Sequence, residues 1–319
     1  MEHREALLAL RTFLSTQILG QEKLIERLLI ALLADGHMLV EGAPGLAKTK
    51  AIKELAEGIE AQFHRIQFTP DLLPADITGT EIYRPETGSF VFQQGPIFHN
   101  LVLADEINRA PAKVQSALLE AMGERQVSVG RSTYDLSPLF LVMATQNPIE
   151  QEGTYPLPEA QLDRFLMHVK IGFPDAAVER RILQQARGEA LNGETKPERR
   201  VSQQAIFAAR KEILGLYMAD AVEDILLQVV LATRTPAKFD PEMAEWIAYG
   251  ASPRGSIALD RCARAHAWLA GRDFVSPEDI QAVLFDVLRH RIILSFEAEA
   301  AGIDQDRVVQ RILDVVAVA

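Results

Sequence analysis

The segment that most constrains the fold is Gly42–Thr49, with the sequence GAPGLAKT. It follows the apolar run 37–41 and precedes the stretch 52–59, in which apolar residues recur at helical spacing. A buried strand, a tight loop and an amphipathic helix are therefore predicted in that order. The segment fits the pattern G-x-x-x-x-G-K-[ST], except that Ala47 stands where the second glycine is usual.

A loop of this kind binds phosphate, because its backbone N–H groups converge and the helix after it points its positive end at the anion. Lys48 would neutralise the β- and γ-phosphates of ATP, and the Thr49 hydroxyl would ligate Mg²⁺. We expect Ala47 to have right-handed helical dihedrals, where a Cβ costs little. A strand–helix turn with a surface lysine is the structural alternative. The candidate nucleotide-binding residues of the loop are Gly42, Ala43, Pro44, Gly45, Leu46, Ala47, Lys48 and Thr49.

Two further apolar strands end in polar residues. Leu101–Glu106 ends in an acid pair, in which Asp105 would hold Mg²⁺ and Glu106 would polarise the attacking water as general base. Asn147 closes a later strand, where it would be placed to bond the γ-phosphate or the water. A solvent-facing acid pair and a turn-forming Asn-Pro are the alternatives for each motif alone. Ligands of open α/β sheets bind at the carboxyl ends of strands, so the three motifs together predict one nucleotide site.

The pattern of elements changes near Phe173-Pro174. Before this point, near-continuous apolar strands alternate with helices, which predicts a parallel sheet covered on both faces. After it, only helices are predicted. We therefore expect an α/β domain over 1–173 and an all-helical lid over 174–319. The expected strands are 37–41, 65–68, 101–104, 139–144 and 166–171, and the expected later helices are 178–190, 203–214, 220–233, 256–270 and 277–288.

Composition excludes several classes. The longest apolar run, near 139–144, is strand-sized, so membrane insertion is not expected. The net charge of −11 opposes approach to nucleic-acid backbones, so a nucleic-acid partner is not expected. Cys262 is the single cysteine, and no targeting segment is evident, so a cytoplasmic location is expected. The seven histidines show no paired spacing suited to a metal site.

With these motifs in view, the chain resembles the AAA+ superfamily and, within it, the MoxR family. The resemblance implies an ATPase that hydrolyses ATP to ADP and phosphate, with an α/β nucleotide domain, a helical lid and a ring assembly that is usually hexameric. It also implies that Gln21 packs near the adenine. The phrases that carry the resemblance are Gly42–Thr49, Ala104–Ala110, Ala144–Glu150, Gly153–Phe165, Gly250–Gly255 and Gly271–Asp279.

Two arginines take roles from the same resemblance. Arg164 resembles an arginine finger that stabilises transition-state charge in the neighbouring subunit's site. A surface arginine paired with Asp163 or Glu159 is the alternative. Arg254 resembles the lid arginine called sensor 2. The triplet 252–254 also reads as a helix start with a serine cap and a first-turn proline, which is the structural alternative for Arg254.

Two connecting segments are longer than plain turns. The stretch 68–96 resembles the helix-2 insertion of the family. The stretch 124–136 is predicted to form a hairpin, because Val127 and Val129 alternate as in a strand and Gly130 supplies a turn. A mobile pore or partner-facing element and an ordinary solvated loop are both compatible with these segments.

The leading hypothesis is a chaperone-like motor that remodels or activates a partner protein. The resemblance suggests partners with von Willebrand factor A domains, or metalloenzyme complexes; no residue names the client. The ATPase subunit of a metal chelatase is an alternative, and a DNA-directed motor is disfavoured by the acidic balance. A scaffold that binds ATP without hydrolysing it is disfavoured because Glu106, Asn147 and Arg164 occur together.

Overall fold

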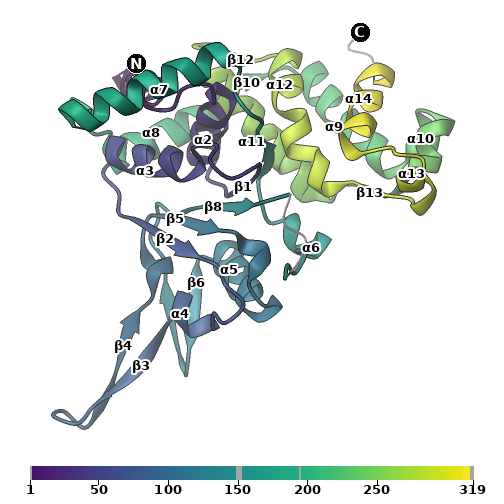
Figure 1. Ribbon diagram of the computed structural model, residues 1–319. Helices are drawn as coiled ribbons and strands as arrows, with labels where there is room; N and C mark the ends of the chain where they lie inside the picture. The colour runs from purple at the N-terminus through teal and green to yellow at the C-terminus, as the bar shows by residue number, and fades with distance from the viewer. Residues whose placement is uncertain (1, 149–152, 194, 317–319) are drawn as a thin grey trace. The chain divides into compact units, whose positions relative to one another are not determined.

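The computed structural model describes residues 2–148, 153–193 and 195–316. Two compact units are present (Figure 1). The α/β unit consists of Glu2–Leu157 and Val169–Ile206, and the lid unit consists of Pro158–His168 and the chain from Phe207 onward. The division at 173/174 stays a prediction. Residues 149–150, which end one of the resemblance phrases, lie outside the described residues.

The centre of the α/β unit is a five-stranded sheet in the order β2-β5-β8-β1-β9. The pairs β2–β5, β5–β8 and β8–β1 are parallel, as the sequence predicts. Inner strands β5 and β8 are buried along almost their whole length, whereas β2 at the edge is largely exposed. The five strands are β1 Met38–Glu41, β2 Phe63–Gln67, β5 Leu101–Asp105, β8 Leu141–Gln146 and β9 Met167–Lys170.

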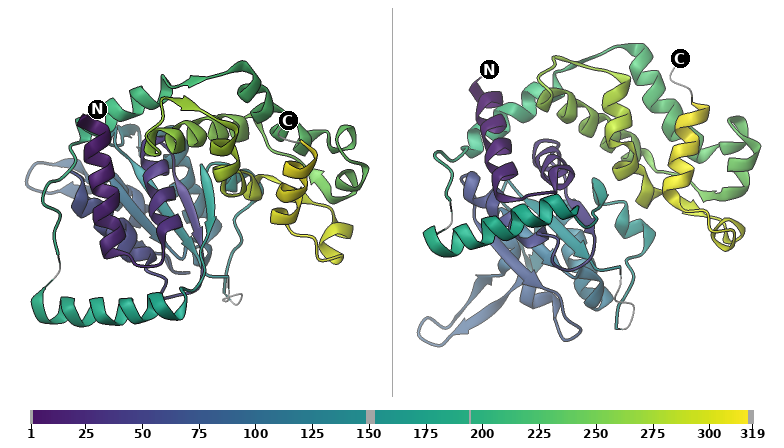
Figure 2. Two further views of the ribbon diagram at one scale, coloured as in Figure 1. Left: turned by 90° about the horizontal axis from the view of Figure 1, so that it is seen from above. Right: turned by 45° about the horizontal axis from the view of Figure 1, so that its top comes forward.

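Helices α1 to α5 of this unit each bury apolar side chains. In α3, Ile52 and Leu55 are completely buried, as is Ile59 directly after the helix, which confirms the predicted amphipathic pattern. Helix α7 is mostly exposed and lies at the outside of the unit in both views of Figure 2. The helices are α1 Glu2–Gln17, α2 Glu22–Leu33, α3 Lys48–Gly58, α4 Pro74–Thr78, α5 Ala112–Glu124 and α7 Ala176–Asn192, with short 3₁₀ turns η1 Pro96–Phe98 and η2 Ile107–Arg109.

Two antiparallel hairpins extend the α/β unit. The first, β3 (Gly79–Arg84) with β4 (Ser89–Gln94), occupies the predicted insertion and projects away from the sheet in Figure 1. The second, β6 (Gln126–Val129) with β7 (Ser132–Asp135), confirms the hairpin predicted over 124–136. The Phe92 ring of the first stacks on the Tyr134 ring of the second, with 4.0 Å between centroids. The stack therefore joins the two hairpins.

The lid unit is mainly helical. Its helices are α6 Glu159–Leu162, α9 Asp220–Arg234, α10 Pro241–Trp246, α11 Pro253–Leu269, α12 Pro277–Leu288, α13 Phe296–Ala300 and α14 Gln305–Val315, with η3 Pro236–Lys238 and η4 Arg289–Arg291; α8, Gln203–Leu214, crosses from the end of the α/β unit into it. Cys262 is buried on α11. None of the helices in the described part of the chain has both the length and the apolar character that crossing a bilayer requires.

The sequence missed two short strand pairings in the lid unit. Strand β10 (Tyr217–Met218) pairs in parallel with β12 (Phe274–Val275), and β11 (Ile247–Tyr249) pairs antiparallel with β13 (Ile293–Leu294). Segments of two or three residues are too short to show a two-residue period. The lid is therefore helical with two small strand pairs.

Candidate functional site

The register of the parallel sheet brings the predicted strand ends to one edge. Glu41 of β1 pairs with Gln146 of β8, and Gln67 of β2 pairs with Asp105 of β5. Because these strands are parallel, the residues that follow them meet at the same carboxyl edge. The phosphate-loop segment, the acid pair and the segment containing Asn147 all start there.

The loop 42–49 connects this edge to α3. A Cβ on Gly42 would lie 2.5 Å from Cγ1 of Ile171, so only glycine fits at that position. Ala47 has φ 57° and ψ 19°, so the expectation of right-handed dihedrals is wrong. Ala47 is the N-cap residue of α3, and its left-handed conformation lets the chain change direction where the helix begins. The Cβ of alanine adds strain of about 1–2 kcal/mol in this conformation. No side chain of the cap residue bonds the first N–H groups of α3.

Lys48 is the first residue of α3. Its Nζ donates to the carbonyl oxygens of Gly42 at 2.5 Å and Ala43 at 3.3 Å. Burial lowers the pKa of the Lys48 ammonium, and the charges of Asp105 and Glu106 oppose that shift. Lys48 therefore lies within electrostatic range of both carboxylates, which is the spatial relation that a shared phosphate and metal site requires.

Thr145 links the two acids. Its hydroxyl donates to Oδ1 of Asp105 at 2.6 Å and accepts from the backbone N–H of Glu106 at 2.9 Å. Thr145 is only 1% exposed. Glu106 has φ 57° and ψ 50°, a left-handed conformation that persists only when neighbouring groups hold it. The Thr145 hydroxyl is one such group.

Three other side chains at this edge were not predicted as part of the site. Arg65 donates through Nη2 to Oδ2 of Asp105 at 2.7 Å, and Gln67 donates to Oε2 of Glu106 at 2.9 Å. Arg109 forms an ion pair with Glu106 at 3.2 Å. Arg65 and Gln67 lie in the last three residues of β2, so their position at a strand end was the signal available in the sequence.

The remaining predicted residues at this edge are Thr49 and Asn147. Thr49 lies half-buried in the first turn of α3, and Asn147 follows β8 and is 7% exposed. Thr49 and Asp105 supply hydroxyl and carboxylate oxygens, the donors that Mg²⁺ prefers. No cluster of three His, Cys, Asp or Glu side chains suited to a metal occurs among the residues described. That is compatible with Mg²⁺, which is usually held by one or two carboxylates together with substrate phosphates.

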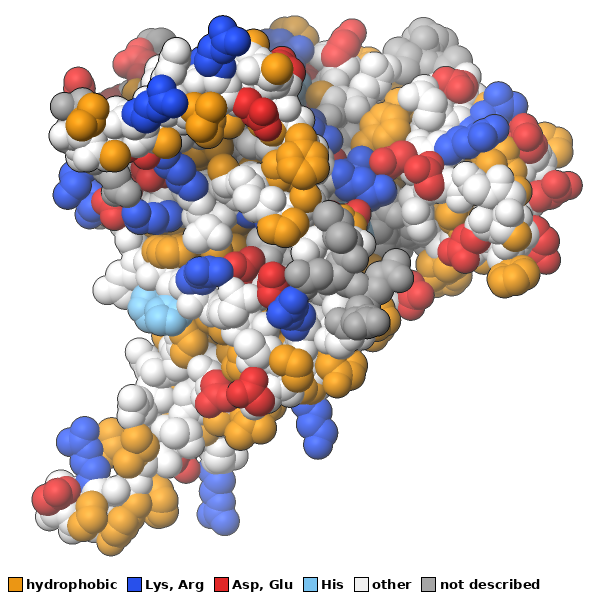
Figure 3. Space-filling view, viewed as in Figure 1, with side chains coloured by type: hydrophobic (Ala, Val, Ile, Leu, Met, Phe, Trp, Pro, Cys, Tyr) orange, Lys and Arg blue, Asp and Glu red, His pale blue; other side chains and the backbone are white. Residues whose placement is uncertain are grey.

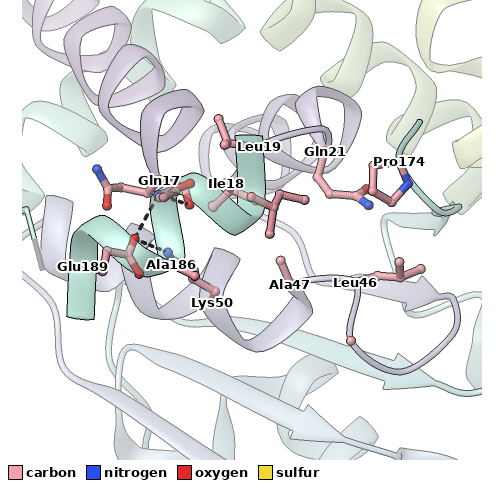
Figure 4. Close-up of a pocket in the computed structure, with 13 residues that line it drawn as sticks. Gln17, Ile18, Leu19, Gln21, Leu46, Ala47, Lys50, Pro174, Ala186 and Glu189 are labelled. Carbon is pink, nitrogen blue, oxygen red and sulfur yellow. Dashed lines mark hydrogen bonds and ion pairs between the residues drawn. The ribbon is translucent and has the colours of Figure 1, made fainter. Parts of the chain in front are cut away.

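A pocket adjoins the loop (Figure 4). Its cavity volume is about 130 Å³, and Gln21, Leu46 and Ala47 contribute to its wall. The side-chain amide of Gln21 donates to the Gly172 carbonyl at 3.1 Å, which fixes its orientation. At another part of the wall, Lys50 Nζ lies 2.7 Å from a Glu189 carboxylate oxygen. The pocket therefore adjoins the predicted phosphate-binding loop.

The two arginines predicted to act in catalysis both lie in the lid unit. Arg254 is exposed in the first turn of α11, and Ser252 caps that helix by accepting from the Arg254 backbone N–H at 3.1 Å. The predicted helix start is therefore confirmed. Arg164 is half-buried after α6. In the described part of the chain neither Asp163 nor Glu159 pairs with it, and Asp163 instead binds Arg291 at 2.9 Å.

Comparison with known proteins agrees with this architecture. Residues 37–167 match the ATPase family associated with various cellular activities (AAA), and residues 242–312 match the AAA lid domain. A solved structure, described as a putative ATPase from Cytophaga hutchinsonii, covers 100% of this chain and 96% of its own, with a TM-score of 0.92 and 45% identity. The chain is thus an AAA ATPase, a class of enzyme that binds nucleotide and hydrolyses ATP.

Curated relatives narrow this class. "Chaperone MoxR1" of Mycobacterium tuberculosis is 46% identical over 303 residues, covering 94% of this chain and 79% of that protein. "Protein MoxR" of Methylorubrum extorquens is 32% identical over 323 residues, covering 95% of this chain and 92% of that protein. The chain belongs to the MoxR family of AAA ATPases, and chaperone-like ATPase activity follows from that membership.

Proposed function

We propose that this protein is a ring-forming motor that hydrolyses MgATP at subunit interfaces and uses the cycle to remodel or activate a partner protein. The observation that supports this most directly is the sheet register, which starts the loop that ends in Lys48 and the acid pair Asp105-Glu106 from the same carboxyl edge. A phosphate-binding cation and two acids in electrostatic range form the constellation that phosphoryl transfer to water needs.

Each residue at this edge has a distinct task. The N–H groups of 42–49 and the Lys48 ammonium bind the phosphates. Thr49 and Asp105 hold Mg²⁺, which when bound neutralises charge on the β- and γ-phosphates. Glu106 accepts the proton of the attacking water, and Asn147 orients that water.

The rest of the machinery comes from the lid unit. Arg164 acts in the site of the neighbouring subunit, where a guanidinium is worth about 10³–10⁵ in rate, and Arg254 acts as sensor 2. The role of Arg164 is supported by its side chain forming no ion pair with Asp163 or Glu159 within the described ranges, since Asp163 pairs with Arg291 instead. A ring, and a hexamer in particular, supplies every site with a neighbour's arginine. In the pocket beside the loop, Gln21 lies near the adenine.

The partner that we propose is a protein, with von Willebrand factor A domain proteins and metalloenzyme complexes as the preferred clients. The β3–β4 hairpin is a suitable contact element, because Ile82, Tyr83, Phe90 and Val91 are 39–67% exposed there. Figure 3 shows hydrophobic side chains gathered at the outer end of this hairpin. The net charge of −11 disfavours nucleic acid, and the single cysteine favours the cytoplasm.

The test uses a trapped nucleotide state. Glu106→Gln should bind MgATP with unchanged affinity and scarcely hydrolyse it, whereas Lys48→Ala should lose nucleotide binding. Partners retained from a lysate by Glu106→Gln with ATP, and absent with Lys48→Ala under the same conditions, identify the client. Near-normal turnover in Glu106→Gln, or wild-type affinity in Lys48→Ala, would contradict the site assignment. Capture of chelatase subunits, or salt-sensitive binding to single-stranded DNA, would favour the alternatives.

A further inference from the structure

Arg291 donates four of its five guanidinium N–H groups to the segment that carries Arg164. Its Nε donates to Oδ1 of Asp163 at 2.9 Å, and its Nη2 donates to the carbonyls of Phe165 at 2.6 Å and Asp163 at 3.4 Å. Its Nη1 donates to the carbonyls of Leu166 at 3.2 Å and of Val287. The acceptors lie on both sides of Arg164 in sequence. The arginine therefore fixes the backbone on either side of residue 164.

The two residues before Arg291 extend this attachment. His290 contacts the Phe165 carbonyl through Nε2 at 3.1 Å, and Arg289 donates to the His168 carbonyl at 2.6 Å. The side chain of Arg291 is only 2% exposed. Burial lowers the pKa of its guanidinium, and the Asp163 charge opposes that shift. Asp163 is thus the counter-charge that makes a buried arginine tolerable at this position.

Asp163 also connects this segment to the start of α11. Its second oxygen, Oδ2, accepts from the Ser252 hydroxyl at 2.8 Å. Ser252 caps the helix whose first turn contains Arg254. The segment 158–168 belongs to the lid unit. Arg164 and Arg254 are therefore parts of one compact unit.

We propose that Asp163 and Arg291 are positioning residues for Arg164, holding the arginine that acts on the neighbouring subunit to the same unit as the sensor arginine Arg254. This inference rests on the proposed action of Arg164 in trans. A displacement of about 1 Å in such a group is enough to cost about 10²-fold in rate. Any movement of the lid that accompanies nucleotide binding in one subunit then moves the arginine that serves the next.

The test is kinetic complementation between subunits. Asp163→Asn keeps the shape of the side chain but removes the charge that orients Arg291. Alone, it should lower kcat about 10²-fold and leave the KM for ATP unchanged. Mixed one to one with Glu106→Gln under conditions that exchange subunits, it should regain turnover, because about one interface in four then joins an intact site to a correctly held arginine.

Three further variants separate the outcomes. Arg164→Ala in the same mixture tests the action in trans, and Arg291→Lys, which keeps the charge but lacks the planar fork, should behave as Asp163→Asn does. Asp304→Asn is the matched control, since Asp304 caps α14 in the same unit through the Arg307 N–H at 2.8 Å and should leave kcat unchanged. Rescue of Arg164→Ala without rescue of Asp163→Asn and Arg291→Lys would overturn the positioning role while leaving the proposed function intact. Failure to rescue Arg164→Ala would overturn both.

Discussion

Replacing Thr145 by valine removes the hydroxyl that joins the two acids and changes almost nothing in shape. Valine fills the same volume, and the site is 1% exposed, so no water can replace the lost group. Two interactions disappear together: the bond donated to Asp105 and the bond accepted from the Glu106 backbone. Glu106 then keeps its left-handed conformation without that support.

The expected loss of stability follows from these two bonds. A hydrogen bond to a charged group contributes about 1.5–3 kcal/mol, and an unsatisfied buried N–H costs about 1–3 kcal/mol. The Asp105 carboxylate keeps the hydrogen bond from Arg65 on its other oxygen. The loss of stability should therefore fall in the lower half of these two ranges. We expect Thr145→Val to destabilise the α/β unit by about 3 kcal/mol and to lower kcat about 10²-fold.

The control is Thr145→Ser, which keeps the hydroxyl and loses one buried methyl group, for about 1 kcal/mol. Both tryptophans, Trp246 and Trp268, lie in the lid unit, so their fluorescence would follow the wrong part of the chain. Amide hydrogen exchange in β5 and β8 instead reports the stability of the α/β unit, which contains Thr145. Stability within about 0.5 kcal/mol of wild type, with turnover equal to that of Thr145→Ser, would refute the reasoning.

Two other measurements test separate parts of the structure. Burial, helped by the charges of Arg291 and His168, lowers the pKa of His290 well below its ordinary value. The unfolded chain therefore binds an extra proton below about pH 6.5, and His290 should make stability fall as the pH is lowered from 7 to 5. His290→Gln should make the free energy of unfolding, measured by urea titration, depend less on pH between 7 and 5. An unchanged pH dependence would count against this role of His290. Phe92→Ala and Tyr134→Ala in a double-mutant cycle should show a coupling of about 0.5–1.5 kcal/mol, whereas strictly additive effects would mean that the stack contributes nothing.

Local patterns in the sequence were sufficient for the sheet and for the ends of its strands. Val102 and Leu103, like Val142 and Met143, are buried on both faces, so the strands show as continuous apolar runs with polar residues where burial ends. Lys48, Asp105 and Glu106 could be found because each directly follows such a run or the loop after it. A motif is visible in sequence when its physical cause is local.

Features that depend on distant residues were not predictable in this way. Asp163 and Arg291 are 128 positions apart, and nothing near either residue indicates the other. Arg65 on Asp105 is another pairing between separate strands. The prediction for the backbone dihedrals of Ala47 was wrong for a different reason. Right-handed dihedrals were expected because they suit alanine, whereas the geometry of the loop holds the residue in a left-handed conformation. Backbone strain at a functional loop overrides the preference of one residue.

The lid unit is discontinuous in the chain, and this has a consequence for how the protein is made and dissected. Residues 158–168 leave the ribosome before Val169–Ile206. The lid unit therefore cannot fold completely until the residues from Phe207 onward have also been synthesised. A truncated polypeptide that begins after Phe173 would lack Asp163 and leave the Arg291 guanidinium without its carboxylate. We expect such a fragment to be poorly soluble, whereas one that restores 158–168 through a short tether should fold.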